Sequence, residues 1–286
     1  MPHIISARQF YAETYDTCVS DWSGEIDFYR EIATAAVNVE DGVVLELACG
    51  TGRIAIRLVQ SGVSVVGLDR SPEMLAVAMR KSTHNKYVHW IEADMRDFEL
   101  DQRFDLVIIP DHSFHNLNSA DDQYACLNCV RDHLVPGGTL VVHLDHMNSH
   151  NMCWLGEISG EKGGIFEEAE RFKHPLTGNQ VQTKRAWSYE TATQTAILQT
   201  VWEEFDDNGE VTNLWDTGLI KLHCVFRFEM EHLLERAGFE MDHLYGDFYR
   251  GELQNDSTEM IWIASRGNNP DTEHFGITTD RKRLRS

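Results

Sequence analysis

The chain has no long uninterrupted apolar stretch and few basic residues for its size. No apolar run approaches the roughly 18 residues that a membrane-spanning helix needs, so we expect no membrane partner. The 286 residues include 25 lysines and arginines against 46 aspartates and glutamates, a formal net charge of −21. Such a chain repels phosphate backbones, which argues against DNA or RNA as a partner. The one basic cluster, DRKRLRS at the C-terminus, is interpreted as part of a flexible tail over residues 267–286.

The sequence also lacks a disulfide framework and a zinc-finger pattern. The six cysteines are scattered along the chain, which is typical of reduced thiols, and the first residues have no signal-peptide features. We therefore expect a cytoplasmic protein. Cys126 and Cys129 form a C-x-x-C pair that could be redox-active or half of a zinc site. Their apolar neighbours recur at helical spacing and no second pair follows at zinc-finger spacing, so a buried helix is favoured.

Between residues 43 and about 145, short apolar segments alternate with amphipathic ones. Strands are expected at 43–47, 63–68, 87–92, 104–109 and 139–144. Helices are expected at about 52–61, 72–81 and 120–134, the last ended by the PGG at 136–138. Near-continuous apolar strands separated by helices predict a parallel sheet covered on both faces. Ligands of such a sheet bind beyond the carboxyl ends of its strands.

Residues 151–226 have a different pattern, rich in Thr, Val, Trp and Tyr, with polar and apolar residues alternating around the turn signal DDNGE. This predicts antiparallel strands inserted after the fifth parallel strand. A helix ending at Gly238 follows, then two strand candidates at 240–248 and 259–265 that suggest an antiparallel hairpin. The first 40 residues are expected to be mostly helical.

The stretch VVLELACGTGRIA, residues 43–55, carries glycines at G-x-G-x-x-A spacing. Gly50 and Gly52 allow a close approach of the backbone to a ligand, and the helix that follows presents free N–H groups. Asp69, at the end of the second strand, stands where an acid would hold ribose hydroxyls. These features fit NAD and several other cofactors equally. Glu46 favours a cationic or amine-bearing ligand over a pyrophosphate, and the closing hairpin differs from the sixth parallel strand of a dinucleotide fold.

With these residues in view, the sequence resembles the class I S-adenosylmethionine-dependent methyltransferases of small-molecule type, over about residues 10–148 and 226–265. The matching segments are VLELACGTGRIAIRL, VVGLDRSPEML, IEADMRDF, FDLVIIPDHSFHNL and the C-terminal RAGFE with its hairpin. The resemblance implies an α/β, Rossmann-like, mostly parallel sheet with an antiparallel C-terminal hairpin strand and an inserted antiparallel β lid. The inserted segment is similar to the lids of small-molecule members, including amino-sugar N-methyltransferases.

The resemblance also implies a seat for S-adenosyl-L-methionine. Glu46 and the backbone around Ala48 and Gly50 would hold its methionine end, and Asp69 its ribose hydroxyls. Met74 would pack on the adenine, and Asp94 with the Met95 backbone would read the edge of that ring. The remaining expected cofactor contacts are Tyr15, Trp22, Cys49, Arg53, Arg70, Ala93 and Pro110. Alternative interpretations are a core methionine for Met74 and a helix cap or surface charge for the two aspartates.

Methyl transfer needs an acceptor in line with the methyl group and, for ammonium or hydroxyl acceptors, a base. The candidate catalytic residues are His112, His115, His146 and Tyr15. The segment PDHSFHNL departs from the family pattern, because Asn116 falls where many relatives have a histidine. No metal is expected at HLDH, residues 143–146, because alternation along a strand turns its two histidines apart.

Four domain segments are expected: a helical cap at 1–40, a cofactor domain at 41–150 and 226–266, a lid at 151–225 and the tail. Trp187, Tyr189, Trp202 and Trp215 could line the acceptor pocket, form a dimer interface or only pack the insert onto the core. The favoured function is methyl transfer to a small molecule, nitrogen slightly ahead of hydroxyl, by a monomer or homodimer. The alternatives are an O-methyltransferase, a non-catalytic S-adenosylmethionine-binding protein and an NAD-dependent oxidoreductase.

Overall fold

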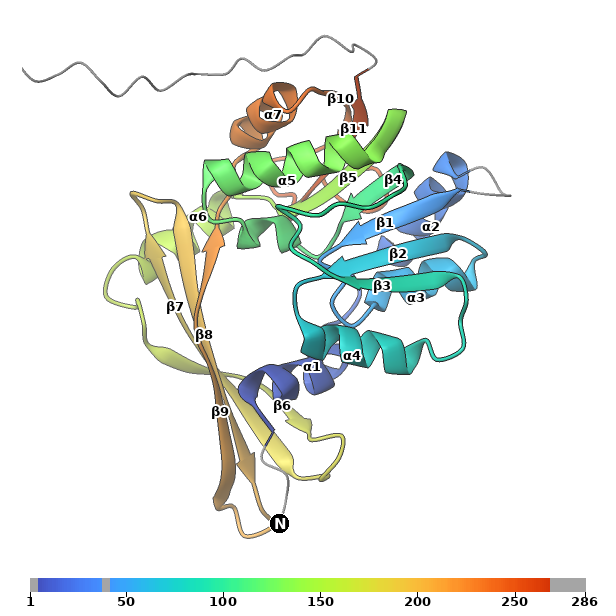
Figure 1. Cartoon of the computed structure of the whole chain (residues 1–286). Helices are drawn as coiled ribbons and strands as arrows, with labels where there is room; N and C mark the ends of the chain where they lie inside the picture. The colour runs from blue at the N-terminus through green and yellow to red at the C-terminus, as the bar shows by residue number, and fades with distance from the viewer. Residues whose placement is uncertain (1–4, 38–41, 268–286) are drawn as a thin grey trace, which may run out of the picture.

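The computed structural model describes residues 5–37 and 42–267, and the expected C-terminal tail lies almost wholly outside them. Its main feature is a seven-stranded sheet in the order β10-β11-β5-β4-β1-β2-β3 (Figure 1). The five parallel strands are β1 (Val43–Leu47), β2 (Ser64–Asp69), β3 (Val88–Glu92), β4 (Phe104–Ile109) and β5 (Leu134–Asp145). The expected doubly covered parallel sheet is confirmed.

Local sequence signals set the helices between these strands. Helix α4 (Pro72–Lys81) begins at Ser71, whose hydroxyl accepts a hydrogen bond from the Met74 backbone N–H, and Pro72 supplies a preset first helical residue. Helix α5 (Ala120–His133) is capped in the same way by Ser119. Helix α3 (Arg53–Gln60) instead starts at a left-handed glycine, Gly52, directly after the glycine loop.

Two apolar cores cover the two faces of the sheet. One joins α5 and α7 (Arg227–Arg236) to the sheet around Leu45, Val107 and Trp262. The other joins α3 and α2 (Glu25–Ala36) to Val44, Leu106 and other side chains of the opposite face. Because side chains alternate along a strand, the neighbours Val44 and Leu45 belong to different cores. Helix α2 is therefore part of the cofactor domain's packing.

The C-terminal strands close the sheet as a hairpin. Strand β11 (Glu259–Arg266) runs antiparallel to β5, and β10 (Phe239–Tyr245) runs antiparallel to β11 at the edge. This confirms the antiparallel ending expected from the sequence and differs from the sixth parallel strand of a dinucleotide-binding fold. One boundary was wrong: β5 was expected to begin at residue 139, but it begins at Leu134 and includes Pro136-Gly-Gly, which a register shift between Leu134 and Thr139 accommodates. Helix α5 ends at His133, close to the expected end.

The insert forms a separate antiparallel sheet in the order β6-β7-β8-β9, comprising β6 (Phe166–Lys173), β7 (Gln180–Glu190), β8 (Thr195–Phe205) and β9 (Val211–His223). It starts with a helix that the pattern did not predict, α6 (Ser149–Ile158). Trp202 and Trp215 are buried against Phe10, while Trp187 and Tyr189 pack beside α6. These contacts pack the lid against α1 (Ala7–Cys18) and α6, and Tyr189 also lines a pocket beside α6.

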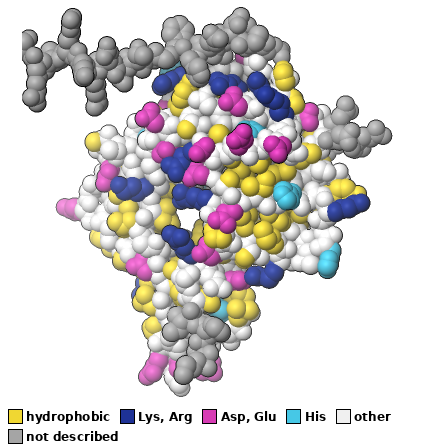
Figure 2. All heavy atoms as spheres, in the orientation of Figure 1, with side chains coloured by type: hydrophobic (Ala, Val, Ile, Leu, Met, Phe, Trp, Pro, Cys, Tyr) yellow, Lys and Arg dark blue, Asp and Glu magenta, His cyan; other side chains and the backbone are white. Residues whose placement is uncertain are grey.

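Helix α1 joins the lid to the cofactor domain. It contacts β9 and β6 on one side and α4 on the other, and it lies between the two sheets in Figure 1. Figure 2 shows a hollow between the sheets on the same face, with charged side chains of both signs at its rim. Among the described helices, none is both long and apolar enough to cross a membrane.

Candidate functional site

The loop between β1 and α3 contains several residues in the left-handed region and packs closely against the Trp90 ring. Ala48, Gly50 and Gly52 all have positive φ, at 53°, 55° and 76°. A Cβ atom on Gly52 would lie 2.4 Å from the Trp90 ring, so this position excludes any side chain. Cys49 is buried directly between these residues. The loop turns sharply and leads its backbone N–H groups into the start of α3, the arrangement that suits an adenosyl or phosphate ligand.

Asp69 fixes this loop from the end of the neighbouring strand. Its Oδ2 accepts a hydrogen bond of 2.8 Å from the Gly50 N–H, and its Oδ1 accepts one of 2.8 Å from the Ser71 N–H. A carboxylate has about four acceptor sites, so further hydroxyl donors can still be bound. Burial raises the pKa of Asp69, while the two backbone donors oppose that rise. The carboxylate is therefore held in place at the position expected to bind ribose.

Glu46 is a buried carboxyl on β1, just before the loop, with one oxygen unpartnered within the described part of the chain. It is 2% exposed, and its Oε2 has no hydrogen-bond partner among the described residues. Burial raises its pKa to about 8, and nearby Arg53 only partly opposes this effect. A buried carboxyl with a free acceptor atom suits a cationic ligand group, because such a group would supply the missing charge and hydrogen bond.

The raised pKa of Glu46 predicts a specific pH dependence of the unliganded protein. Between the unfolded pKa near 4.5 and the folded value of about 8, the folded state binds more protons, so stability falls as pH rises through this window. The slope is at most about 1.4 kcal/mol per pH unit. Glu46→Gln cannot titrate, so its free energy of unfolding should fall less between pH 5 and pH 8. Parallel slopes in urea titrations of the two proteins would refute the assignment.

The residues expected to contact the adenine are already engaged by other parts of the protein. Met74 is 8% exposed and packs with Ala12 and Tyr15 of α1. Asp94 forms an ion pair of 2.7 Å with Arg96 and caps its backbone N–H at 2.9 Å, so the surface-charge interpretation describes its present contacts. The remaining predicted contacts on this side are distributed as follows: the Ala93 N–H donates to the Asp69 carbonyl, Met95 packs on the core, and Arg70 is exposed.

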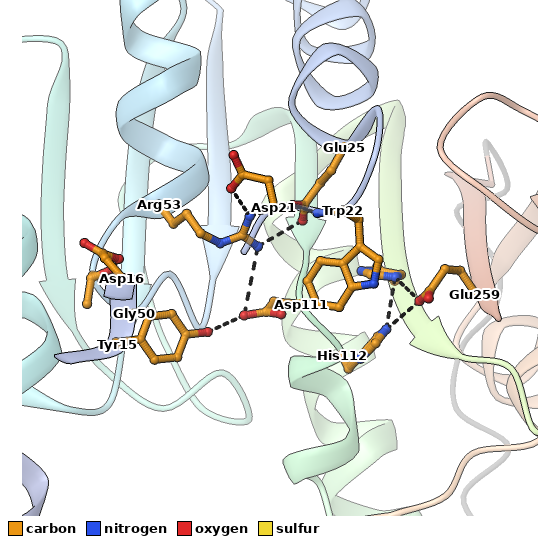
Figure 3. Close-up of polar contacts among 12 residues, drawn as sticks. Tyr15, Asp16, Asp21, Trp22, Glu25, Gly50, Arg53, Asp111, His112 and Glu259 are labelled. Carbon is orange, nitrogen blue, oxygen red and sulfur yellow. Dashed lines mark hydrogen bonds and ion pairs between the residues drawn. The ribbon is translucent and has the colours of Figure 1, made fainter. Parts of the chain in front are cut away.

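The ends of β4 and β5 form the opposite side of the site. Buried Pro110 leads into Asp111 and His112, which have successive positive φ angles of 55° and 56°. Two adjacent left-handed residues other than glycine cost energy and are typical of functional sites. The Tyr15 hydroxyl donates a hydrogen bond to the Asp111 carboxylate (Figure 3). Burial, followed by the charge of Asp111, raises the pKa of Tyr15 far above its usual range, so the phenol stays protonated.

Asp111 lies next to an ion-pair network centred on the Arg53 guanidinium. Arg53 contacts Glu25 at 2.5 Å and Asp21 at 2.7 Å, and its guanidinium is 4.0 Å from the Asp111 carboxylate (Figure 3). The side chains of Arg53 and Glu25 are 9% and 0% exposed. The guanidinium thus links α3, α2 and the end of β4. Arg53 was expected to contact the cofactor; in this structure its guanidinium is paired with Glu25 and Asp21, and its role at the cofactor stays a prediction.

A second polar cluster joins three strands that are far apart in sequence. Nε2 of His112, Nε2 of His143 and Oε2 of Glu259 lie 2.7 to 3.1 Å from one another. Trp22 packs edge-on against both imidazoles, so this residue meets the histidines in addition to lying 5.8 Å from Arg53. Burial lowers the pKa of His143 to about 4, whereas the Glu259 carboxylate outweighs burial and raises that of His112.

The four predicted catalytic residues do not all converge. Tyr15 and His112 lie beside Asp111, as described above. His115 donates through Nδ1 to the His223 carbonyl at 2.6 Å and accepts the Asp145 N–H through Nε2, and burial lowers its pKa to about 4. His146 donates through Nδ1 to the Ser257 carbonyl at 2.9 Å. Their roles as bases remain predictions.

Sequence reasoning missed Glu25, His143 and Glu259 as members of the site. Glu259 contacts His143 and His112, which lie 116 and 147 positions earlier in the chain, and no local motif predicts such contacts. The expectation that His143 diverges from His146 agrees with their different partners. His143 points instead toward His112, a neighbour that β4 and β5 bring together only in the folded sheet.

The order of the strands, the glycine loop after β1 and the acid Asp69 at the end of β2 are together typical of Rossmann-like methyltransferases. In agreement with this, residues 44–138 match the family model described as a methyltransferase domain. The chain is 27% identical over 262 residues to YqeM of Bacillus subtilis, named as a methyltransferase, covering 90% of this chain and 96% of that protein. It is 35% identical over 136 residues to a dTDP-3-amino-3,6-dideoxy-alpha-D-glucopyranose N,N-dimethyltransferase of Streptomyces fradiae, covering 46% and 51% respectively.

A solved structure shares the fold across nearly the whole chain. It is CalS10 of Micromonospora echinaspora, an amino pentose methyltransferase with bound S-adenosylmethionine, at a TM-score of 0.65 and 21% identity over 90% of this chain and 96% of that one. The chain thus carries a methyltransferase domain and shares its fold with S-adenosylmethionine-dependent methyltransferases. It carries the methyltransferase domain on its parallel strands and a separate four-stranded lid.

Proposed function

We propose that the enzyme transfers the methyl group of S-adenosylmethionine to a nitrogen atom of a small-molecule acceptor. The observation that carries the proposal is the concentration of carboxylates around His112: Asp111 precedes it in the chain, and Asp145 and Glu259 lie 3.4 and 2.7 Å from its imidazole. Arg53, whose guanidinium lies 4.0 Å from Asp111, is already paired with Glu25 and Asp21. Such a group of carboxylates attracts a protonated amine.

The cofactor would span the carboxyl ends of β1 and β2. Glu46 would face its ammonium group, and Asp69 would accept hydrogen bonds from its ribose hydroxyls. The sulfonium methyl would then face Asp111 and Tyr15. The Tyr15 ring belongs to an aromatic wall, with Tyr11 edge-on at 5.5 Å, and such a wall stabilises a sulfonium cation.

The acceptor would enter between these carboxylates and the lid. Its amine would bind to Asp111, held in place by the Tyr15 hydroxyl, in line with the departing sulfur. Positioning supplies most of the rate enhancement in such a displacement, and loss of the amine proton frees the lone pair that attacks. The relatives named for amino-sugar substrates support nitrogen as the acceptor atom. The overall negative charge disfavours nucleic acid as the methylated partner.

Mass spectrometry after incubation with methyl-labelled S-adenosylmethionine and a metabolite extract tests the proposal. We expect label in one or a few amine-bearing small molecules, and none in hydroxyl analogues of the same compounds. Label in a hydroxyl group would replace nitrogen by oxygen as the acceptor. Cofactor binding without turnover across a broad acceptor panel would contradict an enzymatic role.

A further inference from the structure

The cluster of His112, His143 and Glu259 has a geometry that hydrogen bonding alone satisfies poorly. Both Nε2 atoms lie 2.7 Å from the same carboxylate oxygen and 3.1 Å from each other. If both imidazoles donate to that oxygen, their two N–H groups lie side by side, and the positive partial charges on the two hydrogens repel each other. If one does not donate, its lone pair faces an anionic oxygen at 2.7 Å. Nδ1 of His143 has no partner among the described residues in either case.

We propose that His112, His143 and Glu259 bind a divalent first-row transition-metal ion. A cation between the three atoms makes every one of these contacts attractive, because two imidazole lone pairs and one carboxylate oxygen would all point at it. Imidazole and carboxylate are ordinary ligands of such ions. The three side chains come from the ends of β4, β5 and β11, and His143 and Glu259 are 0% and 10% exposed. They therefore form a preorganised site.

The spacing of the donor atoms indicates which coordination the site would give. An ion about 2.1 Å from each donor would see these atoms separated by about 80° to 95°. Those angles describe one face of an octahedron, with three further positions open to water or ligand, whereas a closed tetrahedral site needs wider angles. The arrangement thus has the form of a two-histidine, one-carboxylate facial site.

The surroundings hold the His112 ring as a metal ligand is usually held, and aromatic side chains pack against both imidazoles. Asp145 Oδ1 lies 3.4 Å from Nδ1 of His112, so its carboxylate can fix the ring orientation that leaves Nε2 free for the ion. Trp22 packs edge-on against both imidazoles, and Phe248 packs against that of His143. The negative charges of Glu259 and Asp145 balance a divalent cation.

The ion would lie beside Asp111, on the acceptor side of the site. His112 is the most exposed of the three ligands, at 19%, so the open coordination positions would face the hollow between the sheets. An acceptor oxygen or nitrogen could complete the coordination. His112 would then act as a ligand, and its predicted role as a base would pass to a carboxylate. Metal binding itself does not depend on which acceptor the enzyme methylates.

Direct metal binding tests the proposal without any activity assay. Chelator-treated full-length enzyme is dialysed against Co²⁺, Mn²⁺ or Zn²⁺, and bound metal is measured by elemental analysis and by calorimetric titration. We expect one ion per chain, with Co²⁺ giving the visible absorption of a mixed imidazole and carboxylate site. His143→Gln and Glu259→Gln should each weaken binding at least tenfold. His232→Gln changes an exposed histidine on α7 and should leave binding unchanged.

Circular dichroism and S-adenosylhomocysteine binding show whether each variant is folded. If a buried glutamine variant does not fold, Asp145→Asn decides instead, because loss of an outer-shell partner should weaken metal binding about tenfold or more. No stoichiometric ion in the wild-type enzyme would overturn the proposal. An ion that both glutamine variants retain would also overturn it, since binding would then occur elsewhere on the surface.

Discussion

Asp69→Ala should weaken S-adenosylmethionine binding by at least about 100-fold. The carboxylate is expected to bind two ribose hydroxyls, and a charged hydrogen bond of this kind is worth about 1.5 to 3 kcal/mol. Losing both costs about 3 kcal/mol or more, which corresponds to that change in dissociation constant. The same substitution removes the acceptor of the Gly50 N–H, so the glycine loop also loses its support. Calorimetric titration with S-adenosylmethionine measures the effect.

Two further variants separate a direct contact from a general change in charge. Asp69→Asn keeps an acceptor oxygen but loses the negative charge, so its affinity should fall between those of the wild type and the alanine variant. Asp101→Ala removes an exposed acid before β4, away from the carboxyl ends of the strands, and should leave affinity unchanged. Wild-type affinity in Asp69→Ala would show that the ribose is not held at the end of β2.

Glu25→Ala should lower the free energy of unfolding by about 3 to 5 kcal/mol. The substitution leaves the buried Arg53 guanidinium without its 2.5 Å partner, and an uncompensated buried charge is strongly destabilising. Asp21 still contacts Arg53 at 2.7 Å but is itself 32% exposed, so it compensates only in part. Because Arg53 also lies near Asp111, cofactor affinity should fall together with stability. Urea-induced unfolding measures the first effect and calorimetry the second.

The exposed pair between Glu13 and Arg80 provides a matched control. Its atoms are also 2.5 Å apart, but its side chains are 20% and 58% exposed. Solvent screens such a pair, so Glu13→Ala should cost about 1 kcal/mol or less. Equal losses in Glu25→Ala and Glu13→Ala would mean that burial does not control the strength of the Arg53 network.

The parallel sheet could be predicted because its signals are local. The apolar segments VVLEL and FDLVII became β1 and β4 with the expected bounds, and a serine cap followed by proline placed α4 at residues 72–81. The glycine loop and Asp69 were found for the same reason, since fixed chain separations link them to the first two strands. The antiparallel hairpin likewise followed from two neighbouring strand patterns.

The features that sequence missed depend on contacts between distant segments. Helix α6 was overlooked because the strand-forming residues that follow it dominate the insert. A Pro-Gly-Gly sequence usually ends a helix and begins a loop, but Pro136-Gly-Gly lies within β5. Strand β4 pairs with β5 on both sides of it, at Leu134 and at Thr139. Glu259 joins the histidines only after the hairpin has docked on β5. Asp94 carries a suitable motif, and yet its nearest partner is Arg96, two residues away.

A crystal structure of the enzyme with S-adenosylhomocysteine would show directly where the cofactor binds. We expect the ligand in the loop after β1, with the ribose hydroxyls on Asp69, the amino acid portion over Glu46 and the sulfur turned toward Asp111 and Tyr15. Groups within about 3 to 4 Å of the position of the missing methyl would then identify the acceptor site. Absence of binding at millimolar ligand, or ligand bound away from the carboxyl ends of β1 and β2, would contradict this expectation.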